Sequence, residues 1–182
     1  MTRHAIRPGT LEAIVEAAIS VLGANPAASM SEIAIQAGVG RATLHRHFPN
    51  RDALLNLLQH RCLEETNEAV AALVSDEQPS LERLENAMRA IIPLGDRYSF
   101  LSSEYSEDET LVAAYRAQLS WVKTLIRDLK ADGHMATDIP DAWALAQIDQ
   151  QVWIAWDQVS RGHLNAEQAP ELAVRTLLQG LQ

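Results

Sequence analysis

One stretch of the chain decides its fold: residues 29–55, which read SMSEIAIQAGVGRATLHRHFPNRDALL. It begins with a capping box, in which the Ser29 hydroxyl accepts a hydrogen bond from a backbone N–H and the Glu32 carboxylate reaches back to the N-cap. A helix therefore begins here. It ends at Gly38, because glycine readily takes the positive φ that turns a chain sharply out of a helix.

A second short helix follows the turn, from Arg41 to about His47. Leu44 and Phe48 are four residues apart, so both pack inward, together with Val39. Two short helices joined by a glycine turn, with one further helix before them, are typical of a helix-turn-helix. The sequence predicts this unit within roughly the first 48 residues.

The outward face of the second short helix has the chemistry of a DNA-reading surface. The small side chain of Ala42 lets the helix approach the bases, and Arg46 can donate two hydrogen bonds to guanine. Hydroxyl, imidazole and guanidinium groups around them can reach phosphates and sugars. The predicted DNA-binding residues are Ser29, Arg41, Ala42, Thr43, His45, Arg46, His47 and Arg51.

These motifs resemble a known family. The run VGRATLHRHFPNRDALL (residues 39–55), preceded by SMSEIA (residues 29–34), is similar to the DNA-binding domain of the tetracycline-repressor (TetR) family, over roughly residues 8–60. The resemblance implies a homodimer whose two recognition helices enter successive major grooves of a near-palindromic operator. It also implies a transcriptional regulator, a repressor in most cases, that a small molecule releases from DNA.

Site roles carry over by position. The resemblance implies that Ala42 and Arg46 face base edges, while Thr43, His45 and His47 face the phosphate backbone. It implies that Arg51 reaches a phosphate from the start of the next helix. Two positions depart from the family pattern, because His45 stands where the family usually has tyrosine and Ser31 stands where many members have arginine or lysine.

The rest of the chain also has helical periodicity, without a sustained alternating pattern. We therefore predict an all-α fold, with an N-terminal three-helix helix-turn-helix DNA-binding domain (1–50) and a C-terminal helical ligand-binding and dimerisation domain (51–182). The helices expected after the helix-turn-helix cover about 51–76, 80–94, 97–104, 107–132, 139–162 and 166–181.

Charge is distributed unevenly. Residues 1–51 hold five arginines against three glutamates, whereas residues 52–182 hold 10 basic and 21 acidic residues. The basic surplus thus coincides with the predicted DNA-binding domain, although the whole chain carries a net charge of −9. The chain has no apolar run long enough for a membrane span, its first residues lack the apolar core of a signal peptide, and it contains one cysteine. We expect a cytoplasmic protein.

The C-terminal domain is expected to hold an effector. Polar residues interrupt its apolar helix faces, and aromatic walls with a few polar groups are typical of small-molecule sites. The predicted ligand-binding residues are Met88, Phe100, Tyr115, Gln118, Trp121, Asp149 and Trp153. The tryptophans and the scarcity of basic residues indicate an apolar or cationic ligand. For each of these residues, packing in the core is the alternative role.

The last two helices are predicted to form the dimer seam. An apolar stripe on the first contains Ala144, Ile148, Val152, Ala155 and Val159, and the second carries Leu172, Leu177, Leu178 and Leu181. The family uses such a pair of helices from each subunit. The alternative is that these stripes belong only to the core of one subunit.

Two other classes of protein remain as alternatives. An enzyme is disfavoured because the sequence has no G-x-S-x-G, H-E-x-x-H, P-loop or G-x-G-x-x-G motif, and no Cys/His pair with metal spacing. We expect no cofactor and no metal ion. A helical protein-interaction or ligand-binding module without DNA binding is the second alternative, which the arginines around the recognition helix disfavour.

Overall fold

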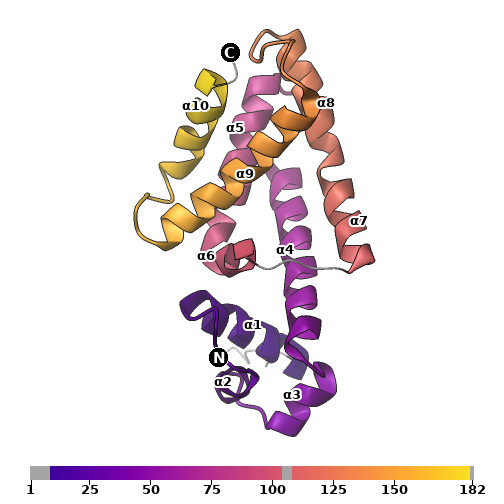
Figure 1. Cartoon of the computed structure of the whole chain (residues 1–182), viewed down its shortest axis with the longest axis vertical. Coiled ribbons are helices and arrows are strands. Elements are labelled where there is room, and N and C mark those ends of the chain that lie inside the picture. The colour runs from indigo at the N-terminus through magenta and orange to yellow at the C-terminus, as the bar shows by residue number, and fades with distance from the viewer. Residues whose placement is uncertain (1–8, 104–107, 181–182) are drawn as a thin grey trace, which may run out of the picture. The chain divides into compact units, whose positions relative to one another are not determined.

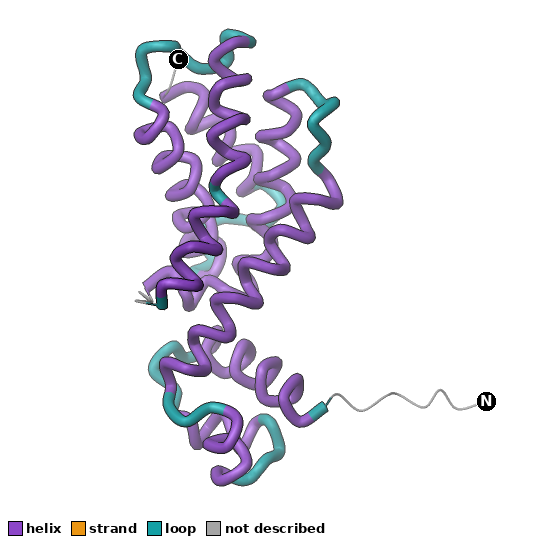
Figure 2. The backbone as a smooth tube through the Cα atoms, turned by 90° about the vertical axis from the view of Figure 1, so that its right-hand side faces the viewer, coloured by secondary structure: helices purple, strands orange, loops and turns teal. Residues whose placement is uncertain are grey.

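The computed structural model describes residues 9–103 and 108–180, and its regular structure over these residues is helical (Figures 1 and 2). No strand occurs in the described part of the chain, which confirms the predicted all-α fold class. The chain forms two compact units that divide between Gln59 and His60. This division lies within α4 (Arg51–Leu73), whereas the sequence led us to place the domain boundary at the start of that helix.

The N-terminal unit is built from α1 (Thr10–Ala24), α2 (Met30–Gln36), α3 (Arg41–His47) and the beginning of α4. Helix α1 packs on α2, and α2 packs on α3. Apolar residues from all four helices, spaced three or four apart, are buried together: Ile14, Val15, Ala18, Leu22, Ile33, Ala34, Leu44, Leu54, Leu55 and Leu58. This small core fixes the helix-turn-helix.

Both local signals at the ends of α2 are confirmed. Ser29 and Glu32 form the capping box, with each side chain bound to the backbone N–H of the other residue. Gly38 has a φ of +67°, and the N–H of Val39 donates to the carbonyl of Ala34 at 3.0 Å. A left-handed glycine with this reaching-back bond is the usual way to end a helix and satisfy its last carbonyls.

The C-terminal unit contains a bundle in which α9 contacts α6, α8 and α10, and α5 contacts α8 and α10 (Figure 1). Short 3-10 segments at Ile92–Leu94 and Ser99–Ser103 flank α6. The helices of this unit beyond α4 are α5 (Ser80–Ile91), α6 (Gly95–Tyr98), α7 (Glu109–Gln118), α8 (Ser120–Ala131), α9 (Asp141–Ser160) and α10 (Ala169–Gly180).

One long helix predicted from the sequence is divided. The expected helix 107–132, whose first residues lie outside the described part, consists of α7 and α8, separated at Leu119. The predicted inward stripe nevertheless runs through both, since Leu111, Val122, Leu125 and Leu129 are buried. The expected helix 97–104 is replaced by the short α6 and a 3-10 segment.

The predicted dimer seam on α9 requires correction. Ala144, Ile148, Val152 and Ala155 are buried inside the chain, because this side of α9 packs against the neighbouring helices of its own unit. Of the leucines predicted on the last helix, Leu177 is buried in the same way, Leu178 is half-buried, and Leu181 lies outside the described residues.

Other apolar residues of the last two helices face outward. Trp143 and Ile154 on α9 are 56% and 50% exposed, and Leu172 on α10 is 36% exposed. On α9 the exposed apolar residues therefore differ from those predicted, whereas on α10 the predicted Leu172 is exposed.

Candidate DNA-binding face and effector site

Helix α3 presents a polar face to solvent. Leu44 and Phe48 are 1% and 4% exposed and hold the helix to the core, as predicted. The residues between and before them point outward: Arg41, Ala42, His45, Arg46 and His47 are exposed and Thr43 is half-buried. The structure thus brings the predicted recognition residues to one accessible helix and leaves their side chains free of the core.

Ser29 has a different environment from the rest of the predicted set. Its hydroxyl donates to the Glu32 carboxylate at 2.7 Å and accepts from the Glu32 backbone N–H at 3.3 Å. Hydrogen bonds from the Ser29 backbone and side chain lower the pKa of Glu32, so the Glu32 carboxylate of the capping box is ionised at neutral pH. Ser29 therefore serves α2 as its N-cap in this structure.

Arg51 also differs from the expectation. Its guanidinium donates to the carbonyl of Ala28 at 2.7 Å and to the carbonyl of Pro26 at 2.5 Å. Both acceptors lie in the connection between α1 and α2. The sequence-based role, a phosphate contact, does not match a half-buried side chain that is bound to its own backbone.

Three of the predicted ligand-binding residues meet in the C-terminal unit. The Tyr115 hydroxyl, on α7, donates to a carboxylate oxygen of Asp149 on α9. The indole N–H of Trp153 donates to the Tyr115 oxygen at 3.4 Å, and the Trp153 ring packs edge-on against Trp156 with centroids 4.9 Å apart. A carboxylate bordered by two aromatic side chains results.

The Asp149 carboxylate of this cluster lacks a cationic partner within the described residues. No lysine, arginine or histidine among residues 9–103 and 108–180 pairs with Asp149. Burial raises the pKa of the Asp149 carboxyl above its ordinary value of 3.8, against the opposing effect of hydrogen bonds from Tyr115, Gln150 and Trp153. Burial likewise raises the pKa of Tyr115, so its hydroxyl stays a donor.

The remaining predicted ligand-binding residues are distributed more widely. Met88 and Phe100 are 1% and 5% exposed and belong to the packed core, which was the alternative role for each. Gln118 and Trp121 are half-buried at the end of α7 and the start of α8. The sequence pattern identified the Tyr115, Asp149 and Trp153 cluster because each lies on an otherwise apolar face.

Cys62, on α4, lies close enough to Tyr115 to affect its ionisation. Burial raises the pKa of the Cys62 thiol to about 12. A thiol that stays protonated is a poor nucleophile and a poor metal ligand, so Cys62 is a packing residue here.

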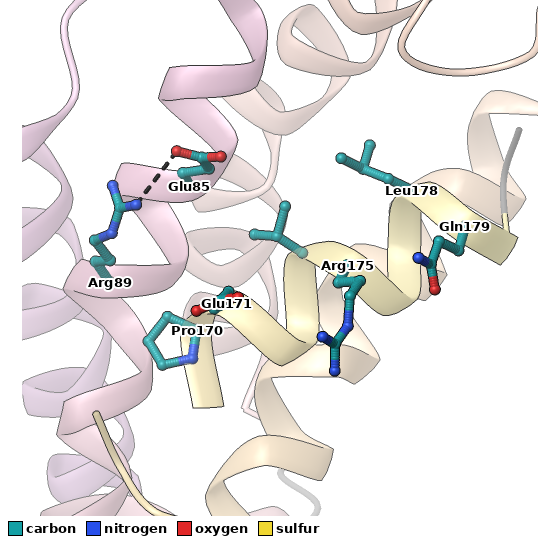
Figure 3. A pocket seen from close by; sticks show the side chains of 8 residues that line it. Glu85, Arg89, Pro170, Glu171, Arg175, Leu178 and Gln179 are labelled. Carbon is teal, nitrogen blue, oxygen red and sulfur yellow. Dashed lines mark hydrogen bonds and ion pairs between the residues drawn. The ribbon is translucent and has the colours of Figure 1, made fainter. Parts of the chain in front are cut away.

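A surface pocket of about 300 Å³ lies elsewhere, between α5 and α10 (Figure 3). It contains none of the predicted ligand-binding residues, and the ion pair between Arg89 and Glu85 lies at its edge. Its lining is Glu85, Arg89, Pro170, Glu171, Val174, Arg175, Leu178 and Gln179. The sequence pattern did not identify a pocket here: Leu178 was predicted as a dimer-seam residue, and the charged residues look like ordinary solvent-facing helix positions.

The described residues contain neither a cluster of metal-ligating side chains nor a helix that could span a membrane. No group of three or more His, Cys, Asp or Glu side chains within these residues could hold a metal ion. None of the helices described here combines the length and apolar character that crossing a membrane requires.

Residues 14–58 match the family described as bacterial regulatory proteins, tetR family. The HTH-type transcriptional repressor LfrR of Mycolicibacterium smegmatis is 34% identical to the chain over 110 residues. That alignment covers 58% of this chain and 58% of the relative, so the chain matches little more than half of the repressor's length.

Solved structures with the same fold cover nearly the whole chain. The crystal structure of the TetR-like regulator LfrR from Mycobacterium smegmatis in complex with proflavine has a TM-score of 0.78 and 24% identity, over 95% of this chain and 97% of that one. The structure of AibR in complex with isovaleryl coenzyme A and operator DNA has a TM-score of 0.76 and 19% identity, over 93% and 98%.

Proposed function

We propose that this chain is a member of the tetR family of bacterial regulatory proteins and a dimeric transcriptional repressor that a small molecule releases from operator DNA. The observation that carries the proposal is the exposed face of α3, where two arginines flank a small residue on a helix anchored by Leu44 and Phe48. Because such DNA lies in the bacterial cytoplasm, we place the protein there.

Different residues of α3 contact the bases and the phosphates because their side chains differ in position and length. Arg46 and Ala42 lie four residues apart on the accessible face, so both reach base edges when the helix enters the major groove. Arg41, Thr43, His45 and His47 border this pair and contact phosphates and sugars. His45 is a shorter donor than the tyrosine usual in the family, so its contact with the phosphate backbone is weaker.

Dimerisation supplies the second recognition helix. We propose that the outward faces of α9 and α10, with Trp143, Ile154 and Leu172, form the subunit contact. Exposed aromatic and aliphatic side chains on neighbouring helices are the kind of surface that subunits bury. A twofold contact of this kind then matches a near-palindromic operator.

The effector class follows from the cluster around Asp149. A half-buried carboxylate without a cationic partner among the described residues, bordered by Tyr115 and Trp153, attracts an aromatic cation through charge and ring contacts. Proflavine, the ligand bound in the related LfrR structure, is such a molecule and serves as the probe. Release from DNA requires only that the cation bind better to the subunit arrangement that fits the operator poorly.

Selection of bound duplexes from random DNA, followed by titration of the selected sequences against salt, tests the DNA-binding part. We expect a near-palindrome whose affinity falls steeply with salt, with a slope of about −0.9 per neutralised phosphate. Arg46→Ala should cost about 1–3 kcal/mol and relax one base position in each half-site.

Arg127→Ala is the matched control, because Arg127 is an exposed arginine of α8 and its loss changes the net charge equally. It should leave the selected sequence and its affinity unchanged. Failure of the wild type to enrich any sequence at low salt would eliminate DNA binding and leave a helical ligand-binding module.

A further inference from the structure

Arg51 forms hydrogen bonds between the two ends of the helix-turn-helix. It is the first residue of α4, which follows α3 after Phe48, Pro49 and Asn50, and it binds the carbonyls of Pro26 and Ala28 in the connection that precedes α2. Its two hydrogen bonds span 25 and 23 residues of the chain. The segment between donor and acceptors consists of α2, the glycine turn and α3, so the bonds join the two ends of the DNA-reading motif.

The buried carbonyl of Ala28 needs such a partner. The connection between α1 and α2 is not helical, and its own hydrogen bonds come from the N–H groups of Ala27 and Ala28, which donate to the side chain and the carbonyl of Asn25 at 3.1 and 2.9 Å. The carbonyls of Pro26 and Ala28 point to the guanidinium instead. Ala28 is buried, and since a buried carbonyl without a donor destabilises a fold, the bond from Arg51 to this carbonyl stabilises the connection.

The position of the connection determines where α2 starts. Ala28 is 2% exposed, and the next residue, Ser29, is the N-cap of α2. A change at Pro26 and Ala28 therefore moves the beginning of α2, and α3 moves with it because α2 packs on α3. A recognition face works only when its residues are held within a fraction of an ångström of their contacts.

We propose that Arg51 is a positioning residue, a clasp that holds the recognition helix in place through the α1–α2 connection, and that it does not neutralise a DNA phosphate. The geometry requires the planar fork of a guanidinium, which places two N–H groups on two carbonyls at once. A lysine ammonium at the end of its flexible chain has the same charge without that fork. The proposal rests on the DNA binding proposed above.

Operator binding measured across salt concentrations, for Arg51→Ala and Arg51→Lys beside the wild type, tests the clasp. We expect both variants to bind about tenfold more weakly with an unchanged dependence of log affinity on log salt. A phosphate contact predicts the reverse, because lysine would rescue it and alanine would reduce the slope by about 0.9. Wild-type affinity in Arg51→Lys, or that smaller slope in Arg51→Ala, would overturn the proposal.

A second readout does not depend on DNA. We expect both variants to melt about 5 °C lower than the wild type and to exchange the backbone amides at the start of α2 faster. Unchanged melting and exchange would also overturn the clasp. If the wild-type protein binds no DNA, the proposed function fails, while melting and amide exchange still decide the role of Arg51. If Arg51→Ala does not fold, the same measurements are made on Arg51→Lys.

Discussion

At the scale of single residues, Asp149 carries an unfavourable charge that the fold tolerates. Its carboxylate is half-buried, it accepts a hydrogen bond from Tyr115, and no cation of the described chain neutralises it. A residue that lowers stability and persists on an otherwise apolar helix face is often kept for binding, since optimised sites trade stability for function. The raised pKa of Asp149 shows that its ionised form lowers the stability of the fold.

Asp149→Asn should bind proflavine at least about tenfold more weakly. Its free energy of unfolding should be higher than that of the wild type by up to about 1 kcal/mol. Because the folded-state pKa of Asp149 is raised, the contribution of this residue to stability is fully present below its ordinary pKa of 3.8 and is lost as the pH rises through the folded-state pKa. Asparagine removes this dependence and still accepts from Tyr115. Calorimetric titration and urea unfolding across that pH window measure both effects.

Asp76→Asn is the matched control for charge, because it removes the same carboxylate charge at an exposed aspartate outside the Tyr115, Asp149 and Trp153 cluster. It should leave proflavine affinity within about twofold. Undiminished affinity in Asp149→Asn would remove the carboxylate from the effector site, whatever its effect on stability.

At the scale of elements, a close approach joins α6 to α9. A Cβ at Gly95 would lie 2.5 Å from Cδ1 of the Trp156 ring, nearer than real Cβ contacts permit. Trp156 is held in place beside this atom, since its indole N–H, on the nitrogen bonded to Cδ1, donates to the carbonyl of Ile91 at 3.1 Å. The ring cannot retreat without losing that bond, so the short α6 depends on glycine for its place on α9.

Gly95→Ala should therefore destabilise the protein by about 1–3 kcal/mol, the usual range for overpacking, despite the higher helix propensity of alanine. Gly23→Ala is the matched control, because Gly23 is also helical, lacks a positive φ and would place its Cβ in open space. It should be neutral or stabilise by up to about 1 kcal/mol. Urea unfolding measures both, and equal midpoints for the two variants would contradict the packing argument.

Elements were predictable where their signals are local. The capping box at Ser29 and the turn at Gly38 each depend on residues a few positions apart, and both are confirmed. The break at Leu119 was not predictable, because the apolar stripe of α7 and α8 continues through it in register. The hydrogen bonds of Arg51 were unpredictable for a related reason: their acceptors are backbone carbonyls far along the chain, which leave no side-chain pattern.

At the scale of the whole molecule, the same apolar periodicity serves both a core and a subunit contact. The stripe through Ala144 and Ile148 was the strongest on α9, and it packs inside the chain. Sequence spacing reports that a helix face is apolar but not what covers it. Ile154 and Leu172 stay exposed after the chain has covered its own core. The other exposed large apolar residues of the described C-terminal unit are Trp143 and Leu73.

Ile154→Glu and Leu172→Glu should each weaken the dimer by about 2 kcal/mol or more, roughly thirtyfold in its dissociation constant, because a carboxylate would be buried against the partner. Leu73→Glu is the matched control: it introduces the same charge at a leucine that is 48% exposed and belongs to the end of α4, not to the last two helices. Sedimentation measures the association.

A monomeric variant keeps an intact α3, so it should lose affinity for the full palindrome and retain its weak affinity for a single half-site. Equal dimerisation of all three variants would place the subunit contact on another surface and would leave the recognition helix as proposed.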